Sequence, residues 1–382
     1  MARIRIFVTV SHISCVYMGL YARSTRVADG EDILILSQGR RSPELVRTIL
    51  DAAALHTWGA VHDLSLPAPP GDDYEPGVIK RFTRRAKDAP VLRHVYAWLL
   101  RRHERELDGR YERILLRLLG NTRASAGSVE IHTHTQAYPL QPLLRIFPRA
   151  TLSFFEHGLG DYHYIADRHR LRAPIRVLFA DRFKKFLGQR GIPAGDVLQL
   201  ELPSDFPRFA EGALGTDRCR YPLPEGRPIV FVLLEAVDMY EVPQAFYAGY
   251  IDRILGAISG PERYHFVLKP HPAQSARSIA TTRARSDESG LSYTVLDDPN
   301  DRGIAAEILF ARFAERTEHV FCLFSSACFY LSQLYRSPHI TYHYSTEHMD
   351  RWTVNAPPMY KRHFEALKPL IREVFSERCQ PY

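Results

Sequence analysis

Residues 151–162 read Thr-Leu-Ser-Phe-Phe-Glu-His-Gly-Leu-Gly-Asp-Tyr, a short apolar run followed by a polar turn with two glycines. The apolar run is typical of a buried strand. It delivers an acid, Glu156, and an imidazole, His157, side by side, and either could take a proton from an acceptor hydroxyl. Gly158 and Gly160 let a ligand approach the backbone closely. The stretch therefore predicts a strand that ends at a functional loop, or else a plain polar turn.

Similar apolar runs recur along the chain and alternate with helical patterns. The runs are Ile4–Val10, Ile33–Leu36, Val61–Leu66, Val129–His132, Thr151–Phe155, Val197–Leu202, Ile229–Leu234, Tyr264–Leu268, Tyr293–Leu296, Val320–Phe324 and His339–His343. The predicted helices are 43–53, 175–187, 243–258, 304–316 and 359–375. Strands that alternate with helices imply parallel sheets, so the fold class is α/β.

A break divides the pattern into two halves. Residues 206–228 contain several prolines and glycines without sustained periodicity, as in an interdomain linker. We therefore expect one Rossmann-like domain over 1–205 and a second over 229–355. In such sheets ligands lie beyond the carboxyl ends of the strands, so the site is expected between the two halves.

Composition excludes several other classes of protein. The 382 residues are 45% hydrophobic and 24% charged, which is globular and not disordered. The five cysteines are scattered without a CxxC pair, which predicts neither a disulfide framework nor a zinc ribbon and fits a reducing compartment. We find no signal-peptide pattern and no apolar stretch of about 18 residues. These observations predict a cytoplasmic protein.

The net charge of +7 is concentrated in one segment. Residues 80–123 hold 13 Lys/Arg against 5 Asp/Glu, within an expected helical insertion over 78–120 in the first half. Such a surface attracts phosphates of nucleic acid, of anionic lipid or of a polyanionic substrate. The insertion is interpreted either as a peripheral contact with an anionic membrane or acidic acceptor, or as ordinary surface helices with solvated arginines.

Two further motifs follow strands of the second half. Residues 267–272 read Val-Leu-Lys-Pro-His-Pro, which holds His271 stiffly between Pro270 and Pro272, beside Lys269. A rigid histidine next to a lysine suits a leaving phosphate, although a proline-flanked turn is the alternative.

The third motif is Ser325-Ser326, which follows the apolar run Phe321–Phe324. It is expected at a helix N-terminus, where free N–H groups and the helix dipole bind phosphate. Simple N-capping would need only one of the two serines.

The order of these motifs resembles the bacterial sialyltransferases and polysialyltransferases of GT-B fold. The first motif of that group matches at Glu156, Gly158, Gly160 and Tyr162. His271-Pro272 matches the group's His-Pro motif, and Ser325-Ser326 its Ser-Ser motif.

The resemblance implies two facing Rossmann-like domains, with a C-terminal helix within 356–382 that crosses back to the first. It also implies an inverting, metal-independent glycosyltransferase without a cofactor. Such an enzyme moves sialic acid, a related nonulosonate or Kdo from its CMP-activated form to a glycan or glycolipid acceptor, in capsule or surface polysaccharide synthesis. Ser325, Ser326, Lys269 and Pro272 would bind the donor phosphate, with His271 acting on it.

The chain departs from this group at His157, where the group has the acid that serves as general base. Either His157 is the base, with Glu156 orienting its ring, or Glu156 is the base itself. The His-Gly pair also makes the chain similar to the CDP-glycerol-type phosphotransferases of teichoic acid synthesis, which is the alternative function. A non-catalytic, basic nucleic-acid- or membrane-binding module is the second alternative, although we expect no nucleic acid partner.

Two weaker signals complete the sequence. Ser11-His12 follows the first strand, where a GT-B enzyme offers acceptor or donor contacts, and a loop histidine is the alternative. His132-Thr133-His134 has the alternation of a strand and predicts no metal site.

Overall fold

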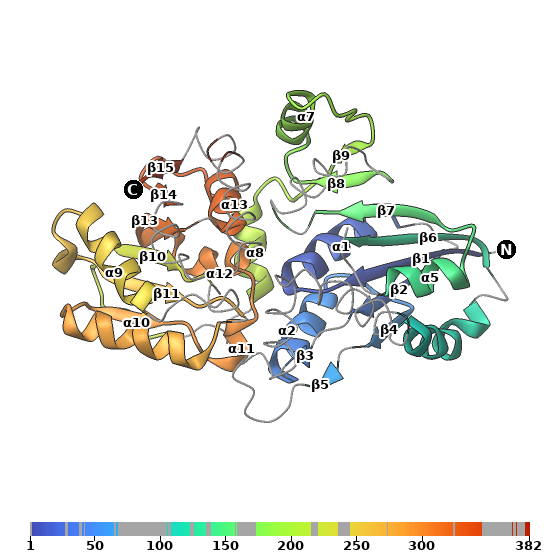
Figure 1. Ribbon diagram of the computed structural model, residues 1–382, viewed down its shortest axis with the longest axis horizontal. Coiled ribbons are helices and arrows are strands. Elements are labelled where there is room, and N and C mark those ends of the chain that lie inside the picture. The colour runs from blue at the N-terminus through green and yellow to red at the C-terminus, as the bar shows by residue number, and fades with distance from the viewer. Residues whose placement is uncertain are drawn as a thin grey trace, which may run out of the picture.

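Two parallel sheets, each covered by helices, form the described part of the chain (Figure 1). The computed structural model describes residues 2–26, 30–37, 40–41, 43–64, 66–67, 105, 108–122, 126–134, 139–156, 158, 173–214, 221–235, 245–272, 274–323, 325–345, 369, 372 and 379–382.

The first sheet has the strand order β4-β2-β1-β6-β7-β8-β9, and all its pairings are parallel. Its strands are β1 (Ala2–Thr9), β2 (Gly30–Leu36), β4 (Ala60–Asp63), β6 (Ala126–His134), β7 (Thr151–Phe155), β8 (Ile175–Val177) and β9 (Val197–Gln199). The helices of this half are α1 (His12–Ser24), α2 (Pro43–Ala53), α5 (Leu140–Ile146), α7 (Ala180–Gly188) and a helix over 108–122. A separate short pair joins β3 (Arg40–Arg41) to β5 (Leu66–Pro67).

The second sheet has the order β12-β11-β10-β13-β14-β15 and is also parallel throughout. Its strands are β10 (Ile229–Leu233), β11 (His265–Lys269), β12 (Tyr293–Val295), β13 (Thr317–Cys322), β14 (Thr341–Tyr344) and β15 (Cys379–Pro381). Its helices are α8 (Phe206–Leu214), α9 (Ala245–Ala257), α10 (Ala276–Glu288), α11 (Pro299–Arg302), α12 (Ala306–Leu309) and α13 (Ser326–Leu334).

The strand order of each sheet reverses direction at one point, between β1 and β6 and between β10 and β13. Ligands of parallel sheets bind beyond the carboxyl ends of strands at such points. α8, α11, α12 and α13 lie between the two sheets, and one hydrophobic cluster includes Phe7 of the first half and Phe310 of the second (Figure 1). The two-domain α/β architecture predicted from the sequence is confirmed.

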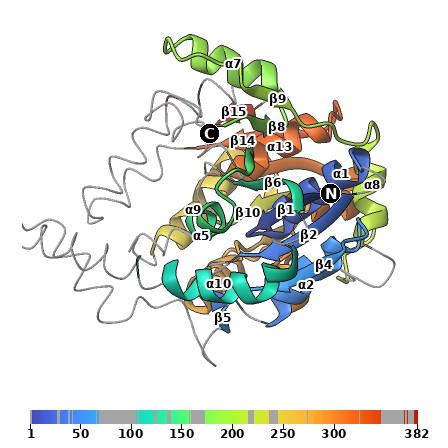
Figure 2. The same ribbon diagram turned by 90° about the vertical axis from the view of Figure 1, so that its right-hand side faces the viewer.

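Alternation along β1 explains how both faces of the first sheet are covered. Ile4, Ile6 and Val8 share a cluster with α5 and with the helix over 108–122, whereas Phe7 packs in the cluster that includes α1 and α2. Figure 2 shows α5 and that helix on one side of the sheet and α1 and α2 on the other. Successive strand residues point to opposite faces, which produces this division.

The described end of the basic insertion is an amphipathic surface helix. Tyr111 and Leu115 are buried against the first sheet one turn apart, while Arg113 and Arg117 are exposed. This part fits the interpretation as an ordinary surface helix with solvated arginines. Residues 78–104, 106–107 and 123 of the basic segment lie outside the described residues.

The predicted helix over 175–187 was wrong at its start. Residues 175–177 form β8, and helix α7 begins only at Ala180. Ile175 and Val177 are buried and alternate with Arg176, and β8 pairs with β7 and β9. Pairing between strands outweighs the helical pattern of this short stretch.

The predicted linker over 206–228 is not irregular throughout, because α8 occupies its first part. Phe206, Ala210 and Leu214 are buried at helical spacing. They belong to the hydrophobic cluster that includes Phe7 and Phe310. The predicted helix over 304–316 is a short α12 followed by two 3-10 turns, Phe310–Arg312 and Ala314–Arg316.

Most of the expected C-terminal crossing helix lies outside the described residues. Near the end of the segment 356–382, residues 379–381 form β15, an unpredicted parallel strand beside β14 in the second sheet. No helix within the described residues is long and apolar enough to cross a membrane.

Candidate functional site

The end of β7 is joined to the second domain through Glu156. This side chain is buried, with 2% of its surface exposed. Its Oε2 accepts a hydrogen bond from the Leu178 backbone N–H at 2.8 Å, and its Oε1 accepts one from the Tyr330 hydroxyl on α13. The carboxylate therefore bonds its own domain with one oxygen and the facing domain with the other.

Gly158 lies against the N-terminus of the same helix. A Cβ built on Gly158 would stand 3.0 Å from Ser326 Oγ, closer than ordinary van der Waals contact. Ser325 is the N-cap of α13, and its Oγ accepts a hydrogen bond from Ala327 N at 3.3 Å. The first and third sequence motifs thus meet at one helix N-terminus, where N–H groups and the helix dipole favour an anion.

The second motif follows β11, two strands away from β13 in the sheet order β11-β10-β13. Two strand spacings amount to about 10 Å. His271 and Pro272 are exposed. The His271 backbone N–H donates to Gln274 Oε1 at 3.3 Å, and its carbonyl accepts from Gln274 N at 3.0 Å. His271 therefore lies on a hydrogen-bonded loop at the same edge of the sheet as the N-terminus of α13, two strands away from it.

Lys269 has a different environment from the one expected for an exposed phosphate ligand. It is buried at the end of β11, and its Nζ donates to Pro270 O at 3.0 Å and to Arg302 O at 2.9 Å. These bonds tie the His-Pro loop to the end of α11, so the lysine supports the loop that carries His271.

Ser11 and His12 begin α1, so the alternative of a loop histidine was wrong. Ser11 caps the helix through a reciprocal pair of bonds with Ser14, at 3.3 and 3.1 Å. His12 is buried, and its Nδ1 accepts a hydrogen bond from Ala305 N of the second domain at 3.4 Å. The histidine therefore contacts the facing domain.

Sequence reasoning missed a titratable cluster near the site. Burial raises the pKa of Glu307, on α12, to about 7, against an opposing effect of Lys269. Burial and then the charges of Glu307 and Glu156 raise the pKa of Tyr17 on α1. Among the described residues, the Tyr17 hydroxyl has no hydrogen-bond partner. No motif marks these residues, since each lies in an otherwise apolar stretch.

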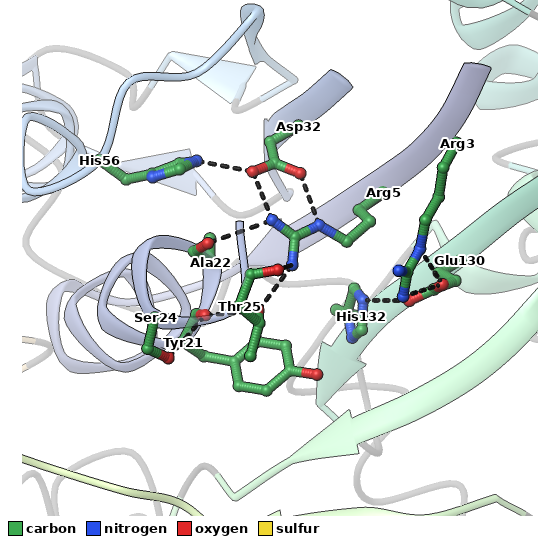
Figure 3. Close-up of polar contacts among 10 residues, drawn as sticks. All are labelled: Arg3, Arg5, Tyr21, Ala22, Ser24, Thr25, Asp32, His56, Glu130 and His132. Atoms are coloured by element: carbon green, nitrogen blue, oxygen red, sulfur yellow. Dashed lines mark hydrogen bonds and ion pairs between the residues drawn. The ribbon is translucent and has the colours of Figure 1, made fainter. Parts of the chain in front are cut away.

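A second charged network fastens the opposite end of α1 (Figure 3). The Arg5 guanidinium donates to both oxygens of Asp32 at 2.6 Å, and His56 Nε2 lies 2.7 Å from the same carboxylate. Arg5 also donates to Ala22 O and Thr25 O near the end of α1. This network therefore holds the C-terminal end of α1, whereas Ser11 caps its N-terminal end.

His132 lies within strand β6, as its alternation predicted. It stacks on Phe7 with ring centroids 4.5 Å apart, and burial lowers its pKa (Figure 3 shows its contact with Glu130). The described residues contain no group of three or more His, Cys, Asp or Glu placed to hold a metal ion. The predicted site residues His157, Gly160 and Tyr162 lie outside the described residues.

Comparison with known proteins identifies the fold. No family model and no curated protein matches the chain. Among solved structures, the chain is similar to UDP-GlcNAc 2-epimerase from Neisseria meningitidis bound to UDP-GlcNAc, with a TM-score of 0.54 and 10% identity over 98% of this chain and 94% of that one. It is also similar to MnaA of S. aureus with UDP, with a TM-score of 0.53 and 10% identity over 99% and 91%. The GT-B fold predicted from the sequence is confirmed.

Proposed function

We propose that the protein is an inverting, metal-independent glycosyltransferase that uses a CMP-activated donor. It transfers sialic acid, a related nonulosonate or Kdo to a hydroxyl of a glycan or glycolipid. The observation that carries this proposal is that Gly158 of the first motif lies against Ser326 of the third at the N-terminus of α13, next to the hydrogen bond between Glu156 and Tyr330 of the same helix.

The donor phosphate is assigned to the N-terminus of α13. The Ser326 hydroxyl and the first backbone N–H groups of the helix bind it, as helix N-termini commonly bind phosphate. His271, exposed at the end of β11, hydrogen-bonds or protonates the leaving phosphate. Lys269 holds the loop that carries His271 through its hydrogen bonds to Pro270 O and Arg302 O.

His157 is assigned as the general base. Both oxygens of the neighbouring Glu156 already accept hydrogen bonds, and its side chain is buried. The donor carries its own carboxylate, which disfavours a second negative charge nearby, whereas a neutral imidazole avoids this repulsion. Glu156 then positions the loop and does not take the proton.

Transfer assays on three variants test these assignments. CMP release from CMP-activated nonulosonates is measured with an acceptor present, for His157→Ala, Glu156→Gln and His271→Ala. The loss of His157 or His271 should slow turnover by about 10²-fold or more, the usual scale for an acid–base group. Normal turnover by His271→Ala, or loss of turnover in Glu156→Gln but not in His157→Ala, contradicts the assignment.

A nucleotide screen separates the proposal from a CDP-glycerol-type phosphotransferase. Thermal unfolding is followed with CMP, CDP, UMP, UDP and GDP, because a ligand that binds only the folded state raises the melting temperature. UDP is included because two structures of the same fold contain UDP or a UDP-sugar. CMP should stabilise most. A larger shift with CDP favours the phosphotransferase, and one with UDP favours a different sugar donor.

The acceptor side of the proposal includes the basic segment 80–123. Its net positive charge attracts anionic lipid or an acidic acceptor, and the exposed Arg113 and Arg117 of its described helix are accessible to either, although they are equally those of an ordinary surface helix. Sedimentation with anionic and neutral vesicles tests this contact. Equal binding to both kinds of vesicle would contradict it.

A further inference from the structure

We propose that Tyr330 is a positioning residue through which the first domain sets the phosphate-binding end of α13. This inference rests on the proposed function, because it assigns the donor phosphate to that helix end. Tyr330 lies one turn after Ser326, so the two side chains share one face of α13. That face meets the first domain at both places, at Glu156 through Tyr330 and at Gly158 through Ser326.

The spacing of these two contacts matches on both sides. Four residues of α-helix rise about 6 Å, from Ser326 to Tyr330. Glu156 and Gly158 are two residues apart in the sequence, and two residues of chain reach at most about 7 Å. This reach is enough to make both contacts, which follow α13 in the antiparallel direction. Because the two residues are so close in the chain, a shift at one contact displaces the other.

The Glu156–Tyr330 contact is buried, which makes it costly to break. Tyr330 is 3% exposed and Glu156 2% exposed. A buried carboxylate must keep its hydrogen-bond donors, since losing one leaves charge without compensation. The Tyr330 hydroxyl thus holds the second domain to a charge fixed in the first.

Segment 178–182 extends the same docking surface along α13. The Phe179 ring lies against Tyr330 at a centroid distance of 6.1 Å and against Phe329 at 5.2 Å. The Arg182 guanidinium lies 5.5 Å from the Phe329 ring centroid, and it donates to Gln333 Oε1 at 3.5 Å. Leu178, which begins this segment, also donates to Glu156. One strip of the first domain therefore supports α13 along its length.

Tyr330→Phe tests the positioning role, with Tyr342→Phe as the matched control. Tyr342 is also buried, and its hydroxyl proton is shared between Leu331 O at 3.2 Å and Tyr335 O at 2.9 Å. It bonds the same helix, but from strand β14 of the helix's own domain. Both variants should lower the melting temperature. We expect the Kd for CMP to rise about tenfold in Tyr330→Phe, the scale of one hydrogen bond to a charged group. It should stay within about twofold of wild type in Tyr342→Phe.

Glu156→Gln provides the conservative rescue. A glutamine can accept from Leu178 N with its carbonyl and donate to the Tyr330 oxygen with its amide, so both contacts survive in neutral form. It should bind CMP more tightly than Glu156→Ala. The positioning role would be overturned if the Kd for CMP rose equally in Tyr330→Phe and Tyr342→Phe. It would also be overturned if Glu156→Gln and Glu156→Ala bound CMP with equal affinity.

Hydrogen exchange keeps this inference separate from the proposed function. If wild type binds none of CMP, CDP and UDP, the proposed function fails on its own. Amide exchange over 325–331 is then compared between the two tyrosine variants. Faster exchange at the N-terminal turn of α13 in Tyr330→Phe but not in Tyr342→Phe supports the positioning role. Equal exchange in the two variants overturns it.

Discussion

Gly158 of the first domain and Ser326 of the second are in contact: a Cβ on Gly158 would stand 3.0 Å from Ser326 Oγ. The two residues are far apart in the sequence and belong to different motifs. Their contact brings a first-domain loop to the N-terminus of a second-domain helix, where an anion is favoured. The proposed donor site depends on this junction.

Gly158→Ala should weaken CMP binding, because the φ of 158° at this position disfavours a side chain and the added methyl must push the Ser326 hydroxyl by a few tenths of an ångström. We expect the Kd for CMP to rise about tenfold, as for the loss of one hydrogen bond to a charged ligand. Calorimetric titration measures it. Gly256→Ala on α9 is the control, since its added Cβ would meet no atom within 4 Å. Unchanged affinity in Gly158→Ala would contradict the assignment of Ser326.

The two serines should differ in what they do. Ser325 caps α13, so Ser325→Ala should lower stability by about 1 kcal/mol. Ser326 is the first helical residue, so Ser326→Ala should leave stability nearly unchanged but raise the Kd for CMP. Urea unfolding and calorimetry of both variants separate the two effects. The reverse pattern would assign the phosphate to Ser325.

Glu307 should make stability depend on pH. Its pKa is about 7 in the folded state, above the ordinary value of 4.5. A raised carboxyl pKa stabilises the fold fully below pH 4.5, and this contribution is lost as pH rises through 7. The shift corresponds to about 3 kcal/mol. Urea unfolding at pH 5 and pH 8 should therefore show that the free energy of unfolding of wild type falls by about that much with rising pH, relative to that of Glu307→Gln. If the free energy of unfolding changed equally with pH in the two proteins, ionisation of Glu307 would not destabilise the fold.

Asp32→Asn should destabilise the first domain strongly. The substitution leaves the buried Arg5 guanidinium without its counter-charge, which typically costs about 3–5 kcal/mol. Arg3→Gln is the control, because it removes only the Arg3–Glu130 pair, in which the Arg3 side chain is 44% exposed, and such pairs contribute about 1 kcal/mol or less. Both are measured by urea unfolding. A similar small effect in both variants would mean that the Asp32 network is not structurally important.

Much of the fold could be predicted from local patterns. β7 has the predicted bounds, and β1 and β10 nearly so, because short apolar runs bounded by turn residues are typical of buried parallel strands. β8 could not be predicted, since three residues carry too little periodicity and are fixed by pairing with β7 and β9. α8 was hidden by the prolines around it, and its burial against α12 decides its structure.

Some residues of the candidate site could be predicted from the sequence, and others could not. Glycine and paired serines after strands mark Gly158 and Ser326, because turns and helix starts need particular residue types. Tyr330, Tyr17 and Glu307 carry no such mark. Tyr330 and Tyr17 lie in helices whose patterns are those of core residues. Only the packing of one domain against the other brings the Tyr330 hydroxyl to Glu156 and places Tyr17 near the charges of Glu307 and Glu156.

The most direct test of the account is calorimetric titration of wild type and Ser326→Ala with CMP and UDP. We predict that wild type binds CMP at least about tenfold more tightly than UDP, and that Ser326→Ala loses affinity for CMP while it keeps its melting temperature. Tighter binding of UDP than of CMP, or an unchanged CMP affinity in Ser326→Ala, would contradict it.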